Sequence, residues 1–178
     1  MRRVVFTGAP GAGKTTVLAE LRSRGHATIG DSGRAIIVDR LRRNLSPRPE
    51  PREFVEEVLR RDVENYTRLA SANELIFYDR GIVDALCMLG QAAPLAPREL
   101  TALLRTYAYD PQVFVFPPWR EIYRNDAERD QTFSDAERVH DRVTRWYRTC
   151  GYKLIEVPRV SAQSRSRYVL RVLGRIDA

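Results

Sequence analysis

The stretch FTGAPGAGKTTV, residues 6–17, combines glycines, one lysine and three threonines in the pattern G-x-x-x-x-G-K-T. Glycines can take backbone conformations that aim successive N–H groups inward, toward the oxygens of a phosphate. The lysine that follows reaches the outer phosphates of a nucleotide, and the hydroxyl after the lysine is a ligand for Mg²⁺. The chemistry that this pattern predicts is the binding of a nucleoside triphosphate together with Mg²⁺.

The residues around this phosphate loop distinguish it from a chance match. An apolar, strand-like segment precedes the loop, and an apolar-periodic helix starts at Thr15. This context places Gly8, Gly11 and Gly13 where their backbone can bind phosphate, and the helix dipole adds positive potential. We therefore expect a nucleotide on this loop, with Lys14 at its outer phosphates and Thr15 at the metal.

The neighbouring motifs favour transfer over hydrolysis. A guanine-specific switch usually carries Asn-Lys-x-Asp late in the chain, and this sequence contains no Asn-Lys pair. A mechanical ATPase usually ends an apolar strand in Asp-Glu, whose glutamate polarises water, but this chain has LIFYDRG. Asp79 can hold Mg²⁺ through water, while Arg80 stands where the hydrolytic base would be. An acceptor other than water is therefore favoured.

Three residues are candidates for contact with that acceptor. Asp31, in TIGDSGRAII, follows an expected strand and is either the base for the acceptor hydroxyl or an N-cap of the next helix. Arg34 pairs with Asp31 or with an anionic substrate, or lies on a solvated helix face. Asp84, five residues after Asp79, contacts the acceptor or caps its helix.

A segment rich in charge, PPWREIYRNDAERDQTFSDAER at residues 117–138, is the expected lid. It follows a strand end and precedes an amphipathic helix. Arg120, Arg124 and Arg129 are the cations that we expect over the phosphates, because the planar guanidinium suits a spread phosphoryl charge. The alternative for each of them is an ordinary place in a charged loop.

Aromatic and histidine side chains give weaker signals. Tyr78, Tyr107 and Tyr109 can stack on a base or belong to the core. His26 and His140 have no metal-ligand spacing around them. The predicted metal ligands are Thr15 of the phosphate loop and Asp79 of LIFYDRG.

The order of apolar segments predicts an α/β fold. The segments RRVVFTG, ELIFYDR, QVFVFPP and YKLIEVP are typical of strands buried on both faces, and HATIG, residues 26–30, is a weaker fifth strand. Amphipathic periodicity predicts helices at residues 13–24, 50–73, 97–109, 135–149 and 161–174, and further helices are expected after Asp31 and Asp79. This alternation predicts a five-stranded parallel sheet covered by helices on both faces, with ligands at the carboxyl ends of the strands.

Length and composition restrict the class of protein. The 178 residues suit one domain, residues 1–178, and the two cysteines are too few for a disulfide framework. No apolar run approaches the roughly 18 residues of a membrane span, and no cleavage site follows Met1, so we expect a soluble cytoplasmic protein. Arginine carries the net charge of +7, which reflects codon bias or anionic ligands. The arginines lack the interleaved aromatic residues of a nucleic-acid platform.

With these motifs the chain resembles the small P-loop ATP-binding proteins grouped with AAA-domain ATPases. This bacterial family is related to nicotinamide-riboside-kinase-like domains and, more distantly, to nucleoside and nucleotide kinases. Besides the phosphate loop, the resemblance uses the stretches DSGRAII, FYDRGIVD, PPWREIYRNDAERDQTF and YRTCGYKLIEVPR. It implies a three-layer P-loop NTPase fold of the nucleoside-kinase type, an Asp-Arg pair at Asp79 and Arg80, and a lid that contains Arg124 and Arg129. The ATP-binding residues that it implies are Gly8, Ala9, Pro10, Gly11, Ala12, Gly13, Lys14, Thr15 and Thr16.

Two positions depart from the pattern of this family. A glutamate normally occupies the place of Asp31, and a lysine often occupies that of Asp130. The shorter carboxylate withdraws the expected base by about 1.5 Å, which costs on the order of 100-fold in rate if nothing compensates. Either the acceptor binds closer to Asp31, or Asp31 binds the acceptor without catalysing. At position 130, the acid removes positive charge from the lid.

The leading hypothesis is an ATP- and Mg²⁺-dependent phosphotransferase that acts on a small, hydroxyl-bearing, nucleoside-like acceptor. Its expected catalytic residues are Lys14, Asp31, Asp79, Arg124 and Arg129, and its expected acceptor-binding residues are Asp31, Arg34, Arg80 and Asp84. Two other hypotheses stay open: an ATP-binding signalling or interaction protein with slow hydrolysis, and a kinase for nucleic-acid ends. The sequence identifies neither the acceptor nor the oligomeric state.

Overall fold

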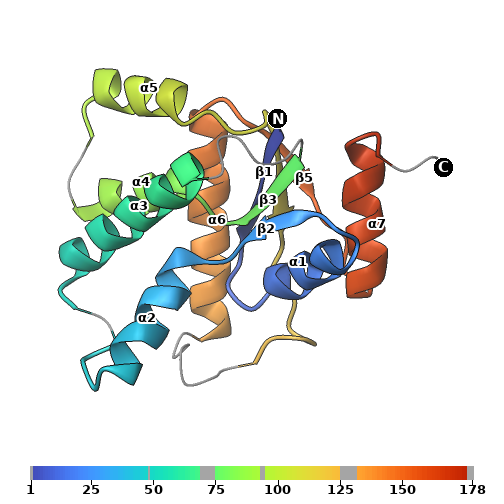
Figure 1. The fold of residues 1–178 in the computed structure, drawn as a ribbon, viewed down its shortest axis with the longest axis horizontal. Helices are drawn as coiled ribbons and strands as arrows, with labels where there is room; N and C mark the ends of the chain where they lie inside the picture. The colour runs from blue at the N-terminus through green and yellow to red at the C-terminus, as the bar shows by residue number, and fades with distance from the viewer. Residues whose placement is uncertain (1, 48, 69–74, 93–94, 125–131, 176–178) are drawn as a thin grey trace.

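The computed structural model describes residues 2–47, 49–68, 75–92, 95–124 and 132–175. Within these ranges, five strands form one parallel sheet in the order β2-β3-β1-β4-β5 (Figure 1). The strands are β1 (Arg2–Gly8), β2 (Ala27–Ile29), β3 (Leu75–Asp79), β4 (Gln112–Phe116) and β5 (Lys153–Glu156). The α/β fold class and the five expected strands are confirmed.

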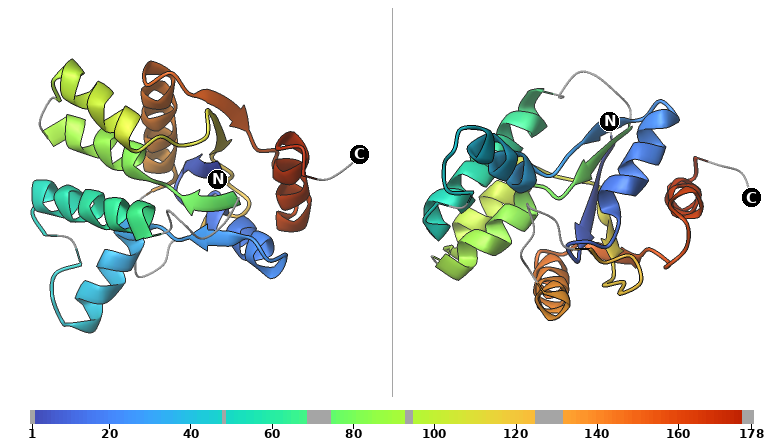
Figure 2. Two further views of the ribbon diagram at one scale, coloured as in Figure 1. Left: turned by 45° about the horizontal axis from the view of Figure 1, so that its top comes forward. Right: turned by 90° about the horizontal axis from the view of Figure 1, so that it is seen from below.

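Helices cover both faces of this sheet, which gives the three layers that the alternation predicts (Figure 2). Apolar side chains of α1 and α7 pack on one face, and those of α3 to α6 pack on the other. None of the described helices is long and apolar enough to cross a membrane. The helices are α1 (Lys14–Ser23), α2 (Ser32–Arg42), α3 (Pro51–Arg68), α4 (Ile82–Ala92), α5 (Pro97–Thr106), α6 (Phe133–Thr149) and α7 (Ala162–Val172).

The expected helices are all present, but some of their ends differ. The helix expected at 97–109 ends at Thr106, and the last residues of the one expected at 50–73 lie outside the described residues. The helix expected from residue 135 starts at Phe133, because Thr132 and Asp135 form a reciprocal capping box ahead of it. Residues 133–138 of the predicted lid, 117–138, belong to this helix, and the lid itself stays a prediction.

Phenylalanines at the centre of the sheet form the layer under α1 and α7. The ring of Phe6 lies 5.6, 5.9 and 5.0 Å from the rings of Phe77, Phe114 and Phe116. All four side chains are fully buried. Successive residues of a strand point to opposite faces, so Val5 instead packs in the layer under α3 to α6.

Burial differs between the centre and the edges of the sheet. The last five residues of β1 and all of β3 are buried, as the apolar segments predict. The expectation of burial on both faces is wrong for β5, whose first and last residues are exposed. This strand lies at the edge of the sheet and has one neighbouring strand, β4, so its outer side stays open to solvent.

The register of the strands brings their carboxyl ends together. Phe6 lies opposite Asp79, and Ile29 lies opposite Tyr78, so the residues that follow β1, β2 and β3 share one edge of the sheet. Ligands of parallel α/β sheets bind at this edge.

Gly8 provides a test of how closely the phosphate loop and β4 approach each other. Its φ is +111°, and a Cβ at this position would lie 2.3 Å from the carbonyl oxygen of Phe116. Gly25 also has a positive φ, +87°, but a Cβ there would meet nothing within 4 Å. We predict that Gly8→Ala lowers the free energy of unfolding by about 3 kcal/mol or more and Gly25→Ala by about 1–2 kcal/mol. Urea unfolding measures both, and equal costs would contradict the close approach.

Candidate functional site

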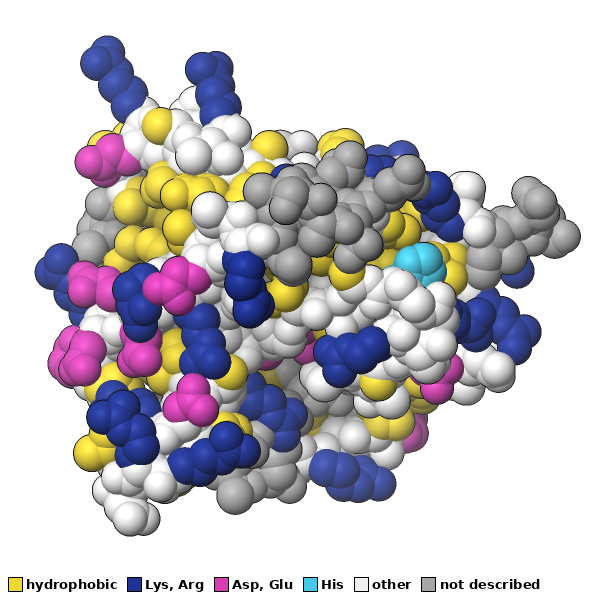
Figure 3. Space-filling view, viewed as in Figure 1, with side chains coloured by type: hydrophobic (Ala, Val, Ile, Leu, Met, Phe, Trp, Pro, Cys, Tyr) yellow, Lys and Arg dark blue, Asp and Glu magenta, His cyan; other side chains and the backbone are white. Residues whose placement is uncertain are grey.

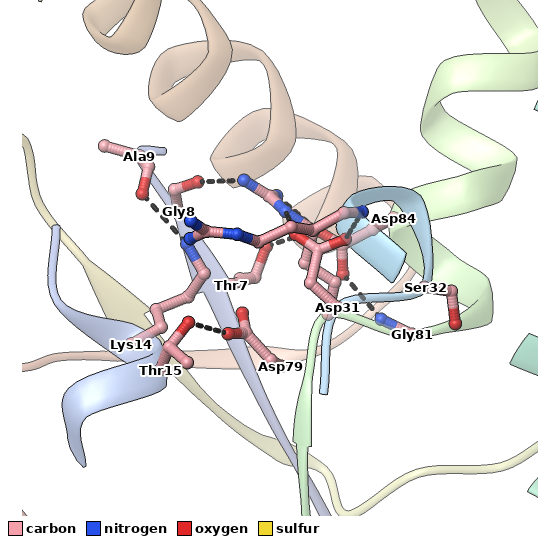
Figure 4. A network of polar contacts seen from close by, with 12 residues as sticks. Thr7, Gly8, Ala9, Lys14, Thr15, Asp31, Ser32, Asp79, Gly81 and Asp84 are labelled. Carbon is pink, nitrogen blue, oxygen red and sulfur yellow. Dashed lines mark hydrogen bonds and ion pairs between the residues drawn. The ribbon is translucent and has the colours of Figure 1, made fainter. Parts of the chain in front are cut away.

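The phosphate loop joins β1 to α1 and has the backbone shape that its glycines predict. Gly8, Gly11 and Gly13 all have positive φ angles, 111°, 74° and 82°, and Gly13 is the N-cap of α1. The Lys14 ammonium folds back over the loop and donates to the carbonyl oxygen of Ala9 at 2.9 Å (Figure 4). The loop, the first turn of α1 and this ammonium therefore form an anion-binding cradle.

Lys14 is unusually deeply buried for a lysine, with 6% of its surface exposed. Burial and the neighbouring Arg80 lower the pKa of Lys14 to about 8, against the opposing effect of nearby carboxylates led by Asp79. A desolvated ammonium that lacks a full counter-charge is suited to an anionic ligand, because the ligand supplies the missing charge.

Thr15 and Asp79 lie together on the adjacent side of the loop. The Thr15 hydroxyl donates to Oδ2 of Asp79 at 2.7 Å, and the carboxylate is 3% exposed. Its Oδ1 is buried without a hydrogen-bond partner among the described residues, and burial raises the pKa of Asp79. A hydroxyl and a carboxylate oxygen are the donors that Mg²⁺ prefers beside nucleotide phosphates. No group of three or more His, Cys, Asp and Glu side chains that could hold a metal ion occurs in the described part of the chain, so these two residues fit Mg²⁺ only as partners of phosphate and water.

Arg80 connects the phosphate loop to two carboxylates. It donates to the carbonyl oxygen of Gly8 at 3.1 Å and to Oδ1 of Asp84 at 3.1 Å, and its Nε lies 3.4 Å from Oδ2 of Asp31. Although burial lowers the pKa of Arg80, the carboxylates of Asp84, Asp31 and Asp79 raise it further, so the guanidinium is fixed in its charged form. Its backbone φ is +66°, a left-handed conformation that costs about 1–2 kcal/mol for a residue with a Cβ.

Asp84 is buried and surrounded by hydrogen-bond donors. Its Oδ1 accepts from Thr7 Oγ1 at 2.6 Å and from Arg80, and its Oδ2 accepts from Tyr147 Oη at 2.7 Å and from Gly81 N at 3.2 Å. The bond from Gly81 is a capping interaction at the start of α4. Asp84 also lines the cavity described below, and its contact with an acceptor stays a prediction.

Asp31 is the N-cap of α2 and also faces Arg80. Its Oδ1 accepts from the backbone N–H of Arg34 at 3.0 Å, while its Oδ2 forms the ion pair with Arg80. Asp31 can therefore cap α2 and face the candidate site at the same time, because a different carboxylate oxygen makes each contact. Arg34 lies in the first turn of α2 and lines the same cavity.

One cavity of about 960 Å³ joins these residues and continues beyond them. Residues of the phosphate loop line it, together with Trp119, Ile122 and Val160. Residues of α2, α3, α4 and α6 also line it, and the part that they form is called the crevice below. The apolar residues of this crevice are Ile37, Phe54, Val55, Val58, Met88 and Val139, and its polar residues include Asp62, Gln91 and Arg142.

The described arginines of the expected lid lie outside this cavity. The Arg120 guanidinium lies 4.2 Å from the centre of the Phe133 ring, and Arg124 donates to the carbonyl oxygens of Glu121 and Tyr123. Arg129 lies outside the described residues. Closure of Arg124 and Arg129 over the phosphates therefore stays a prediction.

Arg165 of α7 is the cation at the loop that sequence reasoning missed. It donates to the carbonyl oxygen of Ala12 at 2.8 Å, and a Cβ on Gly13 would lie 2.8 Å from its Nη2. Its guanidinium lies 5.1 Å from the centre of the Trp119 ring, and burial lowers its pKa. A signal was present in the sequence: Arg165 occupies the helix face of the buried Val169, four residues on.

The three tyrosines considered for stacking belong to the core. Tyr78 and Tyr109 are buried, with ring centres 5.4 Å apart, and Tyr107 packs against the same cluster. None of them lines the cavity, so the stacking interpretation is wrong and the core interpretation holds.

The fold and the phosphate loop together define an α/β domain of the P-loop NTPase class. The profile of a family described as an AAA domain matches residues 3–165, and the chain belongs to this family. No curated protein matches the sequence.

Solved structures of other proteins share the fold, and two of those described here are named as kinases. Deoxyadenosine kinase from M. mycoides with bound dATP has a TM-score of 0.64 at 12% identity, over 98% of this chain and 100% of that chain. The NadR protein in complex with NR has a TM-score of 0.69 at 16% identity, over 97% of this chain and 52% of that chain. Thymidylate kinase from Ehrlichia chaffeensis has a TM-score of 0.62 at 16% identity, over 97% of this chain and 98% of that chain. The three-layer, nucleoside-kinase-like architecture is therefore confirmed.

The network around Asp84 generates a prediction about stability. Asp84→Asn removes the charge that compensates the largely buried Arg80, so we expect a loss of about 3 kcal/mol in the free energy of unfolding. Asp39→Asn removes a carboxylate that pairs with Arg61 on the surface, and it should cost less than about 1 kcal/mol. Thermal and urea unfolding of both variants makes the comparison. Equal costs would show that the network contributes little.

Proposed function

We propose that this protein is an ATP- and Mg²⁺-dependent phosphotransferase whose acceptor is a small, hydroxyl-bearing, nucleoside-like molecule. The observation that carries this proposal is the lining of the cavity. The phosphate loop, Asp31 and Arg80 line the same cavity as a largely apolar set of residues from α2, α3, α4 and α6. A triphosphate and an acceptor can therefore bind end to end, with the transferable phosphate between them.

The comparisons support this proposal at the level of class. The structures with the same fold are named as kinases of deoxyadenosine and thymidylate, and one of them contains dATP. The nucleotide at the phosphate loop of this chain is accordingly assigned as ATP in the proposal. Arg80, in place of a hydrolytic glutamate, favours transfer to an acceptor over hydrolysis.

The residues of the site have distinct parts in the proposed reaction. The loop N–H groups and the Lys14 ammonium bind the outer phosphates and stabilise the negative charge of the transition state. Thr15 and Asp79 would hold Mg²⁺, which neutralises phosphate charge. Asp31 accepts the proton of the acceptor hydroxyl, while Arg80 holds Asp31 beside the loop. Phosphoryl transfer depends mainly on the positions and charges of the groups around the phosphate. The hydrogen bond from Arg80 to Gly8 therefore contributes, because it holds Arg80 and Asp31 in position beside the loop.

A surface feature favours a small acceptor over a polynucleotide. On the face seen in Figure 3, Lys and Arg side chains are spread over several elements, and acidic side chains lie among them at the left of the view. A track for a phosphate backbone would gather cations along one line.

Lys14 and Lys153 are the only lysines of the chain, and they allow a matched test of the loop. With labelled γ-phosphate, Mg²⁺ and pooled nucleosides, nucleotides, sugars, aminoglycosides and short oligonucleotides, the wild type should yield a labelled small-molecule product. Lys14→Ala should abolish transfer and weaken ATP binding at least tenfold, whereas Lys153→Ala, on the exposed start of β5, should change neither. Full activity of Lys14→Ala, or labelling of oligonucleotides alone, would contradict the proposal.

The pKa of Lys14 predicts how nucleotide affinity depends on pH. The ammonium is charged below its pKa of about 8 and loses its proton above it. Bound phosphate stabilises the charged form, so the affinity for ATP should fall as the pH rises from 8 to 10 and binding should then take up a proton. Calorimetric titration in buffers of different ionisation enthalpy measures this uptake. An affinity independent of pH would show that Lys14 does not contact the phosphates.

The variant Asp31→Asn distinguishes the proposed role of Asp31 as a base from its role as the N-cap of α2. Asparagine is as good an N-cap as aspartate, so α2 should keep its bond from Arg34 N, while the proton acceptor is lost. We expect turnover to fall at least 100-fold with ATP affinity within twofold of the wild type, measured by steady-state kinetics and titration. Unchanged turnover would leave Asp31 with the cap alone.

A further inference from the structure

Asp62 of α3 is a buried carboxylate that the proposed reaction does not use. It is 7% exposed and lines the crevice beyond Asp31. Its Oδ1 accepts a 2.5 Å hydrogen bond from the hydroxyl of Ser32, the residue after Asp31. Its Oδ2 accepts no hydrogen bond from the residues that the structure describes. One oxygen is therefore tied to the start of α2, and the other is left for whatever occupies the crevice.

The surroundings of Asp62 disfavour the charged form of its carboxyl group. Burial raises the pKa of Asp62 to about 7, Asp84 and Asp31 contribute in the same direction, and Ser32 and Arg80 oppose them. The other titratable groups that it influences, Tyr78 and Tyr109, are buried and neutral. Oδ2 is not among the fully buried atoms without a partner, so it is open to the crevice, where a ligand can donate a hydrogen bond to it, more favourably when the donor is cationic.

The same surroundings disfavour an anionic ligand in the crevice, where the cations that line the cavity, Arg34 included, already have partners. Ile37, Val55 and Val58 form apolar walls that do not solvate charge. Arg80 is held by Gly8, Asp31 and Asp84, and Arg142 is bonded to Gln91. A phosphate dianion near Asp62 would meet a like charge at low dielectric.

We propose that Asp62 determines acceptor specificity: the acceptor is an unphosphorylated hydroxyl compound with an apolar body, and it donates an N–H hydrogen bond to Asp62 Oδ2 while its hydroxyl faces Asp31. This inference rests on the proposed function and names the substrate class of the same site. It assigns nucleosides and other neutral or cationic amino-bearing compounds to the crevice, and it excludes phosphomonoesters such as nucleoside monophosphates.

The test uses ATP with a labelled γ-phosphate and compares two pools of acceptors. The first pool contains amino-bearing nucleosides, such as adenosine and cytidine, together with amino sugars. The second pool contains the corresponding 5′-monophosphates and sugar phosphates. Asp62→Asn keeps the size of the side chain and an oxygen for Ser32, but it presents an N–H donor where the carboxylate accepted. Glu64→Gln is the control, because Glu64 lies on the same helix, is exposed and pairs with Arg60. Thermal unfolding checks that both variants are folded.

We expect transfer to the unphosphorylated pool only. For the labelled acceptor, Asp62→Asn should raise KM at least tenfold and leave KM for ATP within twofold, whereas Glu64→Gln should change neither. At saturating ATP, the wild-type KM for the acceptor should fall about tenfold from pH 6 to pH 8 as Asp62 ionises, because a carboxylate with a pKa of about 7 goes from about a tenth to about nine tenths charged. In Asp62→Asn this dependence should vanish, which a merely structural role would not cause.

The outcomes separate this inference from the function on which it rests. Transfer to the monophosphate pool would overturn the inference and leave the phosphotransferase standing. An unchanged acceptor KM in Asp62→Asn, or the same pH dependence in both proteins, would do so as well. Tight ATP binding without transfer to either pool would overturn the proposed function and the inference together.

Discussion

The site depends on how a largely buried guanidinium, that of Arg80, is compensated. Taking an arginine out of water is costly unless its N–H groups find charged or polar partners in good geometry. Here the partners are the carbonyl oxygen of Gly8, Asp84 and Asp31, which come from three different segments of the chain. Because each partner is needed, the arginine fixes the phosphate loop, the start of α2 and the start of α4 relative to one another. The left-handed backbone of Arg80 is maintained by the same contacts.

This constraint determines where chemistry can occur in the cavity. The loop amides, Lys14 and Arg165 make an anion-binding region of the cavity. The crevice is apolar, and its buried acid, Asp62, has one oxygen without a partner in the described chain. The two regions are suited to ligands of opposite character, an anionic one and a neutral or cationic one. Asp31 lies at their boundary, where a transferred phosphate would meet a hydroxyl.

The sequence predicts the parts of this site that follow from local spacing. The phosphate loop is contiguous, Asp31 follows one strand of a parallel sheet and Asp79 ends another, and the carboxyl ends of such strands must share an edge. Arg165 and Asp62 were missed because their contacts come from tertiary packing: Arg165 bonds to a residue 153 positions away. Both are charged residues on the apolar face of a helix, with Asp62 four residues after the buried Val58. A charged residue on the apolar face of a predicted helix was therefore the feature of the sequence that could have identified both of them. The lid arginines were predicted from position along the chain, which does not determine where a long loop lies.

The central claim is that one continuous cavity holds the triphosphate and the acceptor end to end, and dinucleoside tri- and tetraphosphates test it most directly. Such a molecule carries both ligands on one phosphate chain, so binding the first end raises the effective concentration of the second. Calorimetric titration with Mg²⁺ should give one molecule per chain, at least tenfold tighter than ATP, with the advantage reduced by Asp62→Asn and lost in Lys14→Ala. Binding no tighter than that of ATP would show that the crevice does not face the phosphate loop as the account requires.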